Sequence, residues 1–103
     1  MALIQQAAET ITVDTAIGIT ASLLETTGAP LNRFVADFQH RSGGKIFGLA
    51  SAAPDAAGGN GEKEYVVGSE WKVTGYEDIK NFKMIKQTGE SNATVDVQLY
   101  GTP

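Results

Sequence analysis

Oxygen-bearing side chains gather in one short, glycine-rich stretch of the sequence, where they could ligate a cation. The residues are Asp55, Asn60, Glu62 and Glu64, and Ca²⁺ accepts carboxylate and amide oxygens in flexible geometry. Their spacing does not match an EF-hand loop. We therefore favour the alternative, a solvated loop in which Asp, Asn and Gly serve turns, and we expect neither a bound metal nor a cofactor.

His40 is the only histidine, and the chain has no cysteine. A catalytic imidazole needs a positioned nucleophile or carboxylate, and a zinc site with one histidine would depend on carboxylates for its other ligands. We interpret His40 as an ordinary turn residue that follows a strand. Because no carboxylate pair, Ser/His/Asp set or cofactor fingerprint stands out, the sequence predicts a protein that is not an enzyme.

Two glycine runs, Gly43-Gly44-Lys45 and Gly58-Gly59-Asn60-Gly61, have the flexibility of phosphate-binding loops. A P-loop requires Gly-x-x-x-x-Gly-Lys followed by Ser or Thr. Around the first run, Gln39 stands where a P-loop has its first glycine, and Ile46 stands where it has Ser or Thr. Glu62 follows the last glycine of the second run, where a P-loop has lysine. Both runs are therefore predicted to be turns.

Four aromatic side chains, Tyr65, Trp71, Tyr76 and Tyr100, could form a platform for sugar rings. Trp71 alternates with Val73, which favours a core position, because a small sandwich needs large apolar side chains to fill its interior. Tyr100 lies on the face of its segment opposite the apolar side chains. We therefore expect Tyr100 to be exposed or at an interface.

These side chains are carried by short segments that alternate in character and are separated by glycine-rich or polar turns, a pattern typical of strands. The alternation is clearest at 33–39, where Phe34, Ala36 and Phe38 share a face, and at 93–100. Further strands are expected at 9–13, 17–24, 45–49, 64–67, 71–74 and 82–86, with one helical turn at 76–81. The predicted fold is all-β, a single antiparallel β-sandwich of jelly-roll or Greek-key type with seven or eight short strands.

The 103 residues are enough for one domain, which we place at residues 9–103. Residues 1–8 are predicted to form an N-terminal arm without a strand partner, whose Leu3 and Ile4 could lie across a neighbouring subunit. Residues 50–63 form the one long loop, and such loops are often functional. Asp55 and Asn60 in this loop, together with Tyr100, complete the set of candidate partner contacts.

Charge and size also limit the partners. The net charge is −4 and the eight Lys and Arg residues are dispersed, so we expect no nucleic-acid binding. A domain this small buries a limited share of its surface, which favours a homo-oligomer. The first residues have neither a basic region nor a long apolar run, so we expect a cytosolic product without a membrane anchor.

Between Ile17 and Gly101 the sequence has, in order, a Thr-rich start, a predicted strand that ends before Gly43-Gly44, and a spacer with Pro and Gly. They are followed by a Tyr-x-x-Gly-x-x-Trp-like segment, a Gly-Tyr-x-x-Ile phrase and a closing alternating strand (65–71, 75–79 and 93–100). In this order the chain resembles the small β-sandwich virion structural proteins of tailed bacteriophages.

This resemblance implies a virion component that assembles in the host cytoplasm and has no active site. It would act by binding other virion proteins such as the major capsid protein, as a capsid decoration or cement protein or as a head- or tail-associated protein. The alternative interpretation is a carbohydrate-binding β-sandwich module that uses the long loop and exposed aromatic side chains.

Overall fold

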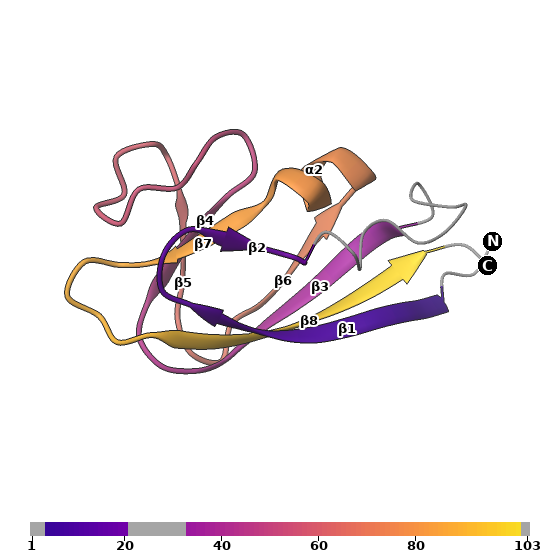
Figure 1. The fold of residues 1–103 in the computed structure, drawn as a ribbon, viewed down its shortest axis with the longest axis horizontal. Coiled ribbons are helices and arrows are strands. Elements are labelled where there is room, and N and C mark those ends of the chain that lie inside the picture. The colour runs from indigo at the N-terminus through magenta and orange to yellow at the C-terminus, as the bar shows by residue number, and fades with distance from the viewer. Residues whose placement is uncertain (1–3, 21–32, 102–103) are drawn as a thin grey trace.

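The computed structural model describes residues 4–20 and 33–101, which fold into two four-stranded antiparallel sheets packed face to face (Figure 1). The larger sheet has the order β1 (Ile4–Val13), β8 (Ala93–Gly101), β3 (Arg33–Ser42) and β6 (Glu70–Thr74). The smaller sheet has the order β2 (Ile17–Gly18), β7 (Lys83–Lys86), β4 (Ile46–Leu49) and β5 (Lys63–Tyr65). The predicted antiparallel sandwich is therefore confirmed.

The strand pairing is nested. β1 pairs with β8, β2 with β7, β3 with β6 and β4 with β5, all antiparallel. This is the pattern of one long hairpin rolled up so that its strands alternate between two sheets. Of the two predicted topologies, the fold is the jelly roll.

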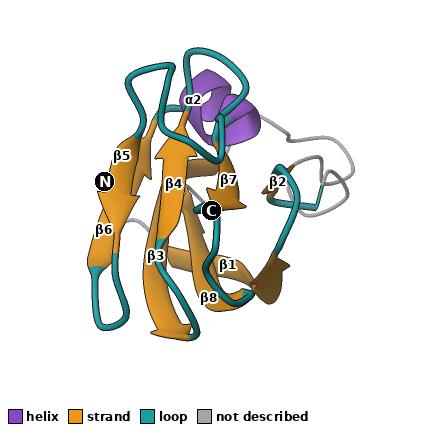
Figure 2. Cartoon of the chain, turned by 90° about the vertical axis from the view of Figure 1, so that its left-hand side faces the viewer, coloured by secondary structure: helices purple, strands orange, loops and turns teal. Residues whose placement is uncertain are grey.

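The core lies between the sheets and is filled by alternate residues of the long strands. Along β8 every second side chain from Ala93 to Leu99 is buried, because successive strand residues point to opposite faces of a sheet. The helix α2 (Tyr76–Asn81) closes one end of the sandwich (Figure 2) and buries Ile79, which confirms the predicted helical turn. The other large buried side chains include Ile11, Val13, Ile46, Phe82 and Met84.

A row of aromatic rings joins the two sheets. Trp71 of β6 stacks on Tyr65 of β5 with 3.7 Å between ring centroids, and on Phe38 of β3 with 5.3 Å. Phe38 in turn meets the Phe82 ring, tilted, at 5.0 Å. Burial raises the pKa of the Tyr65 hydroxyl. The core interpretation of Trp71 is thus confirmed, and Tyr65 belongs to the same cluster.

The first strand begins earlier than predicted. Ile4 pairs with Gly101 and Gln5 with Tyr100, so residues 4–8 have a strand partner and are not a free arm. Alanine is depleted in strands and glutamine is not among the favoured strand formers, but the long β8 supplies a ladder that overrides this local preference. A register shift between Gln5 and Ala7 adjusts the pairing.

His40 lies within β3 rather than in a turn, because β3 continues to Ser42. Its side chain is only 1% exposed, and its Nε2 lies 2.7 Å from the Gly44 carbonyl oxygen, so Nε2 carries the proton and donates it. Its backbone N–H donates to the Ser69 carbonyl, and its carbonyl accepts from Gly68 N–H, both at 2.9 Å. The turn interpretation was wrong. His40 is a buried residue of β3 whose hydrogen bonds connect this strand with the turn that follows it and with the turn before β6.

Two strands end earlier than predicted. Of the segment 17–24, Ile17 and Gly18 form β2, and residues 21–24 lie outside the described part of the chain. β5 ends at Tyr65, and Val66 and Val67 lie in the following turn with 42% and 58% exposure. Ser69 Oγ and Ser69 N–H bond the backbone of Val66 and so close this turn.

Candidate functional site

The outward side of the larger sheet forms a broad polar surface, which we call the outer face. Its side chains alternate with core residues along four adjacent strands, so their positions follow from the strand periodicity. All of them are exposed or half-buried. They are Gln5, Ala8, Thr10 and Thr12 on β1; Thr94, Asp96, Gln98 and Tyr100 on β8; Val35, Asp37, Gln39 and Arg41 on β3; and Glu70, Lys72 and Thr74 on β6.

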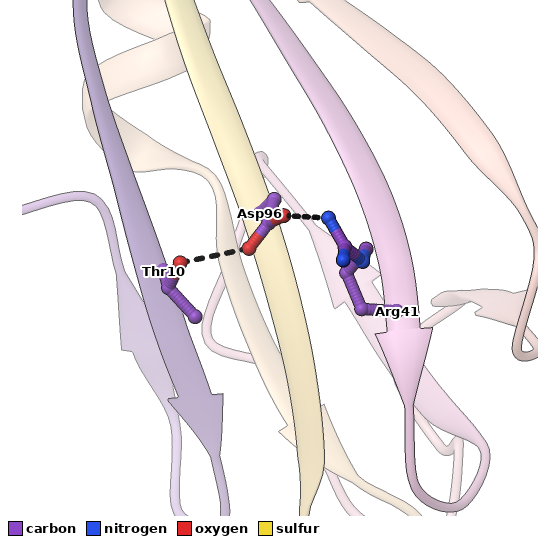
Figure 3. A network of polar contacts seen from close by, with 3 residues as sticks. All are labelled: Thr10, Arg41 and Asp96. Carbon is purple, nitrogen blue, oxygen red and sulfur yellow. Dashed lines mark hydrogen bonds and ion pairs between the residues drawn. The ribbon is translucent and has the colours of Figure 1, made fainter.

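Three strands contribute to a hydrogen-bonded network on the outer face (Figure 3). Arg41 Nη1 donates to Asp96 Oδ2 at 2.6 Å, and Thr10 Oγ1 donates to Asp96 Oδ1 at 2.8 Å. The Arg41 and Asp96 side chains are 57% and 30% exposed. Exposed ion pairs of this kind add little stability. They link three polar side chains of neighbouring strands into one cluster on the surface.

We expect a double-mutant cycle between Arg41→Ala and Asp96→Ala to give a coupling energy of about 0.2–1 kcal/mol, because solvent screens the pair. Urea unfolding of the four proteins, followed by fluorescence of the single tryptophan, measures this energy. A coupling energy several times larger would contradict the solvent-exposed geometry.

Tyr100 lies on the outer face, as the alternation of β8 predicts. With Val35, Asp37, Lys72 and Thr74 it lines a hollow of about 290 Å³. Its hydroxyl donates to Gln98 Oε1 at 2.9 Å, which fixes the ring at the edge of this hollow. An aromatic side chain here stands beside a carboxylate, an ammonium group and a hydroxyl.

The structure brings together only part of the predicted contact set. Ile4 and Tyr100 belong to paired strands at the same end of the larger sheet. Leu3 lies outside the described residues. Asp55 and Asn60 lie in the loop between β4 and β5, which extends from the other end of the molecule (Figure 1). The predicted residues therefore do not form one site.

Glu62 organises the long loop. Its Oε1 accepts the Asn60 N–H at 2.8 Å, and its Oε2 accepts the Asp55 N–H. Asn60 Nδ2 donates to the Ala53 carbonyl at 3.0 Å. Of the candidate cation ligands, the Asp55 and Glu62 carboxylates thus accept hydrogen bonds within the loop, and Glu64 accepts one from Gln87. The described residues contain no group of three His, Asp or Glu side chains placed to hold a metal ion.

The loop should respond to acid through Glu62. Hydrogen bonds, chiefly from the Asp55 N–H, lower the pKa of Glu62 below its ordinary 4.5. A lowered carboxyl pKa favours folding above the ordinary value, and this contribution is lost as the pH falls through the lower, folded pKa. We expect the Asp55 and Asn60 amide NMR shifts to titrate with a midpoint below 4.5.

The Glu62→Gln variant should lose this titration, whereas Glu77→Gln on α2 should keep it. A wild-type midpoint at or above the ordinary value would show that the carboxylate does not bind these amides in solution.

The sequence did not single out Arg41 or Asp96. Both stand at polar positions of alternating strands, so periodicity alone could have assigned them to the exposed face. Their contact joins strands far apart in the chain, and it follows from the register in which Gln39 pairs with Asp96 and His40 with Val95. Only the strand order brings the two side chains together.

No protein-family model, curated protein or solved structure matches this chain. The described residues include no helix long and apolar enough to cross a membrane. The outer face, which spans all four strands of the larger sheet, is therefore the surface on which we base a functional proposal.

Proposed function

We propose that this chain is a structural, non-catalytic protein of a bacteriophage virion, either a capsid decoration or cement protein or a head- or tail-associated protein. It acts by binding other virion proteins such as the major capsid protein. The observation that carries the proposal is the outer face, a polar surface spread over four strands and ordered by its own hydrogen bonds.

The charges of the outer face suit a protein partner. Three carboxylates, of Asp37, Glu70 and Asp96, are interspersed with two cations, Arg41 and Lys72. A non-obligate protein interface is on the whole about as polar as the rest of the protein surface, whereas nucleic-acid binders concentrate positive charge. Because hydrogen bonds already hold several of these side chains, less conformational entropy is lost when a partner binds.

The jelly-roll topology supports the proposal by analogy. This fold recurs in viral capsid proteins and in lectins, and it carries many unrelated functions. The sequence resemblance to phage virion proteins favours the first of these two settings. The fold and the resemblance therefore point to the same class of protein, and the outer face supplies the means of attachment.

Co-sedimentation with virions tests the proposal. Antibodies against the purified chain are used to probe virions separated from the lysate on a density gradient, and stripped particles are then incubated with tagged protein. The wild-type chain should band with the particles. The double variant Gln39→Lys/Gln98→Lys, which adds two charges to the centre of the outer face, should lose most of this binding.

The matched control is Ser51→Lys/Ala52→Lys, which adds the same charge at exposed positions of the long loop. It should bind as the wild type does. If the chain is missing from virions, the proposed function is wrong. If the loop variant loses binding and the outer-face variant keeps it, the attachment surface is wrong.

Carbohydrate binding is a second candidate, favoured by the hollow beside Tyr100. Sugar rings pack on aromatic faces and need hydrogen-bonding groups next to them, and Asp37, Lys72 and Thr74 provide such groups. A glycan array should then detect binding that Tyr100→Ala abolishes and Tyr100→Phe largely retains. A blank array with folded protein would reject this candidate.

A further inference from the structure

β1 forms one edge of the larger sheet. One side of this strand pairs with β8 from Ile4 to Val13, and none of the described strands pairs with its other side (Figure 1). The backbone N–H and C=O groups on such an edge are free to pair with a further strand. A long free edge is therefore a potential binding site for another chain.

The other sheet edges in the described residues are protected. β2 has two residues and β5 has three, of which Lys63 and Glu64 are charged. β6 has five residues and carries Glu70 and Lys72. Short length and exposed charge are the usual means by which proteins prevent edge pairing. β1 has ten residues, a single charge and no proline.

That single charge is already engaged. The Glu9 carboxylate accepts the Thr20 N–H at 2.8 Å and the Thr20 hydroxyl at 2.7 Å. The neighbouring outward side chains, Ala8, Thr10 and Thr12, are exposed, uncharged and small. A partner strand approaching β1 would thus meet no free charge along the regular part of the strand.

We propose that β1 pairs antiparallel with β1 of a second copy of this chain and joins the two larger sheets into one. β1 itself is the only described edge of matching length and low charge that a second copy can offer. Pairing of this kind is two-fold symmetric and closes on itself. It leaves only short edges free, so assembly by edge pairing stops at the dimer.

The register of β1 suggests where the two-fold axis lies. The register shift between Gln5 and Ala7 leaves Ala7–Val13 as the regular part of the strand, and Thr10 is its midpoint. Pairing about Thr10 places Thr10 opposite its copy and Ala8 opposite Thr12 on the outer face. Small and β-branched side chains are compatible with such cross-strand positions.

This inference goes beyond the proposed function, and in a virion the dimer would present two outer faces on one continuous sheet. A dimer that makes the same contact with the capsid twice gains avidity without any new type of contact. The dimer itself is nevertheless a property of the free protein. It can be measured without virions.

Sedimentation of the free protein over a concentration series is the first test, since a contact of one strand with one strand is small. The wild type should reach twice the 10.9 kDa of one chain. Ala8→Lys/Thr12→Lys, which places charges on the β1 edge, should remain monomeric with an unchanged circular dichroism spectrum. The control Gln39→Lys/Gln98→Lys carries the same added charge on central strands and should still dimerise.

Disulfide trapping is the second test, in a chain that has no native cysteine. Thr10→Cys should form a covalent dimer on mild oxidation, and Gln39→Cys on β3 should form much less. A monomeric wild type, a dimeric Ala8→Lys/Thr12→Lys variant, or equal trapping by the two cysteine variants would overturn the inference.

The two proposals fail differently. If the wild type is monomeric but binds virions, β1 pairing is wrong and the proposed function stands. If it dimerises through β1 but is absent from virions, the proposed function is wrong and the dimer stands.

Discussion

Phe38→Ala is expected to destabilise the protein by about 3–5 kcal/mol, the usual cost of removing a buried aromatic ring. Phe38 is fully buried at the centre of the aromatic row, where its ring meets Trp71 and Phe82. The substitution would leave a cavity between the two sheets. Because native proteins have only about 5–15 kcal/mol of stability, this loss is a large share of the total, and the variant should unfold at a much lower urea concentration than the wild type.

Urea unfolding followed by fluorescence of Trp71 measures this loss, because the only tryptophan stacks on Phe38. Phe38→Leu is the matched control, which keeps much of the volume and should cost less. A loss below about 1 kcal/mol for the alanine variant would contradict the packing of Phe38, since it would lie far outside the range for buried aromatic residues.

Gly48→Ala should also be strongly destabilising, although it adds only one methyl group. An added Cβ on Gly48 would lie 2.6 Å from Cζ of Phe82 and 2.9 Å from Cε2 of Tyr65. Both rings belong to the buried cluster, so neither can move freely. Overpacking of this kind costs about 1–3 kcal/mol, and thermal unfolding should show a clearly lowered Tm.

The control for Gly48→Ala is Gly59→Ala in the exposed loop, where the nearest atom to the added Cβ is Oδ2 of Asp55 at 3.0 Å. It should change the Tm little. Adding Phe82→Leu to Gly48→Ala should cost less than the sum of the two single substitutions, because the smaller side chain relieves the collision. Strict additivity would show that the methyl group does not meet the Phe82 ring.

The sequence predicted the fold well where one strand face is buried and the other exposed. β8 and the first part of β3 alternate strictly, because the outer face meets solvent and the inner face meets the core. It failed at Ile4–Ala8, whose strand depends on pairing with β8 rather than on local preference. Non-local pairing leaves no periodic signal in such small and amide-rich residues.

The candidate site was predicted in part for the same reason. Tyr100 could be placed on an exposed face because its strand alternates. The network of Thr10, Asp96 and Arg41 could not, because it depends on the order β1-β8-β3. The role of Glu62 in the loop was also missed, since its acceptors could equally have served a cation or backbone amides.

His40 shows a different limit of sequence reasoning. A histidine next to Arg41 and glycine residues has a composition typical of a turn, yet its ring is buried and donates to the Gly44 carbonyl. The bond from His40 N–H to Ser69 connects β3 with the turn before β6. Which polar side chains a fold buries depends on partners brought by other segments, and these contacts are long-range.

The nested strand pairing has a consequence for synthesis on the ribosome. β8 lies between β1 and β3, so the larger sheet cannot form its central ladders until β8 has emerged. The innermost pair, β4 with β5, can form much earlier in synthesis. β1 has no partner strand until β8 is made, so its apolar side chains stay exposed until then. Chains dominated by such distant contacts fold slowly and are exposed to aggregation meanwhile. We expect release of nascent chains truncated before β8 to yield protease-sensitive, aggregation-prone protein.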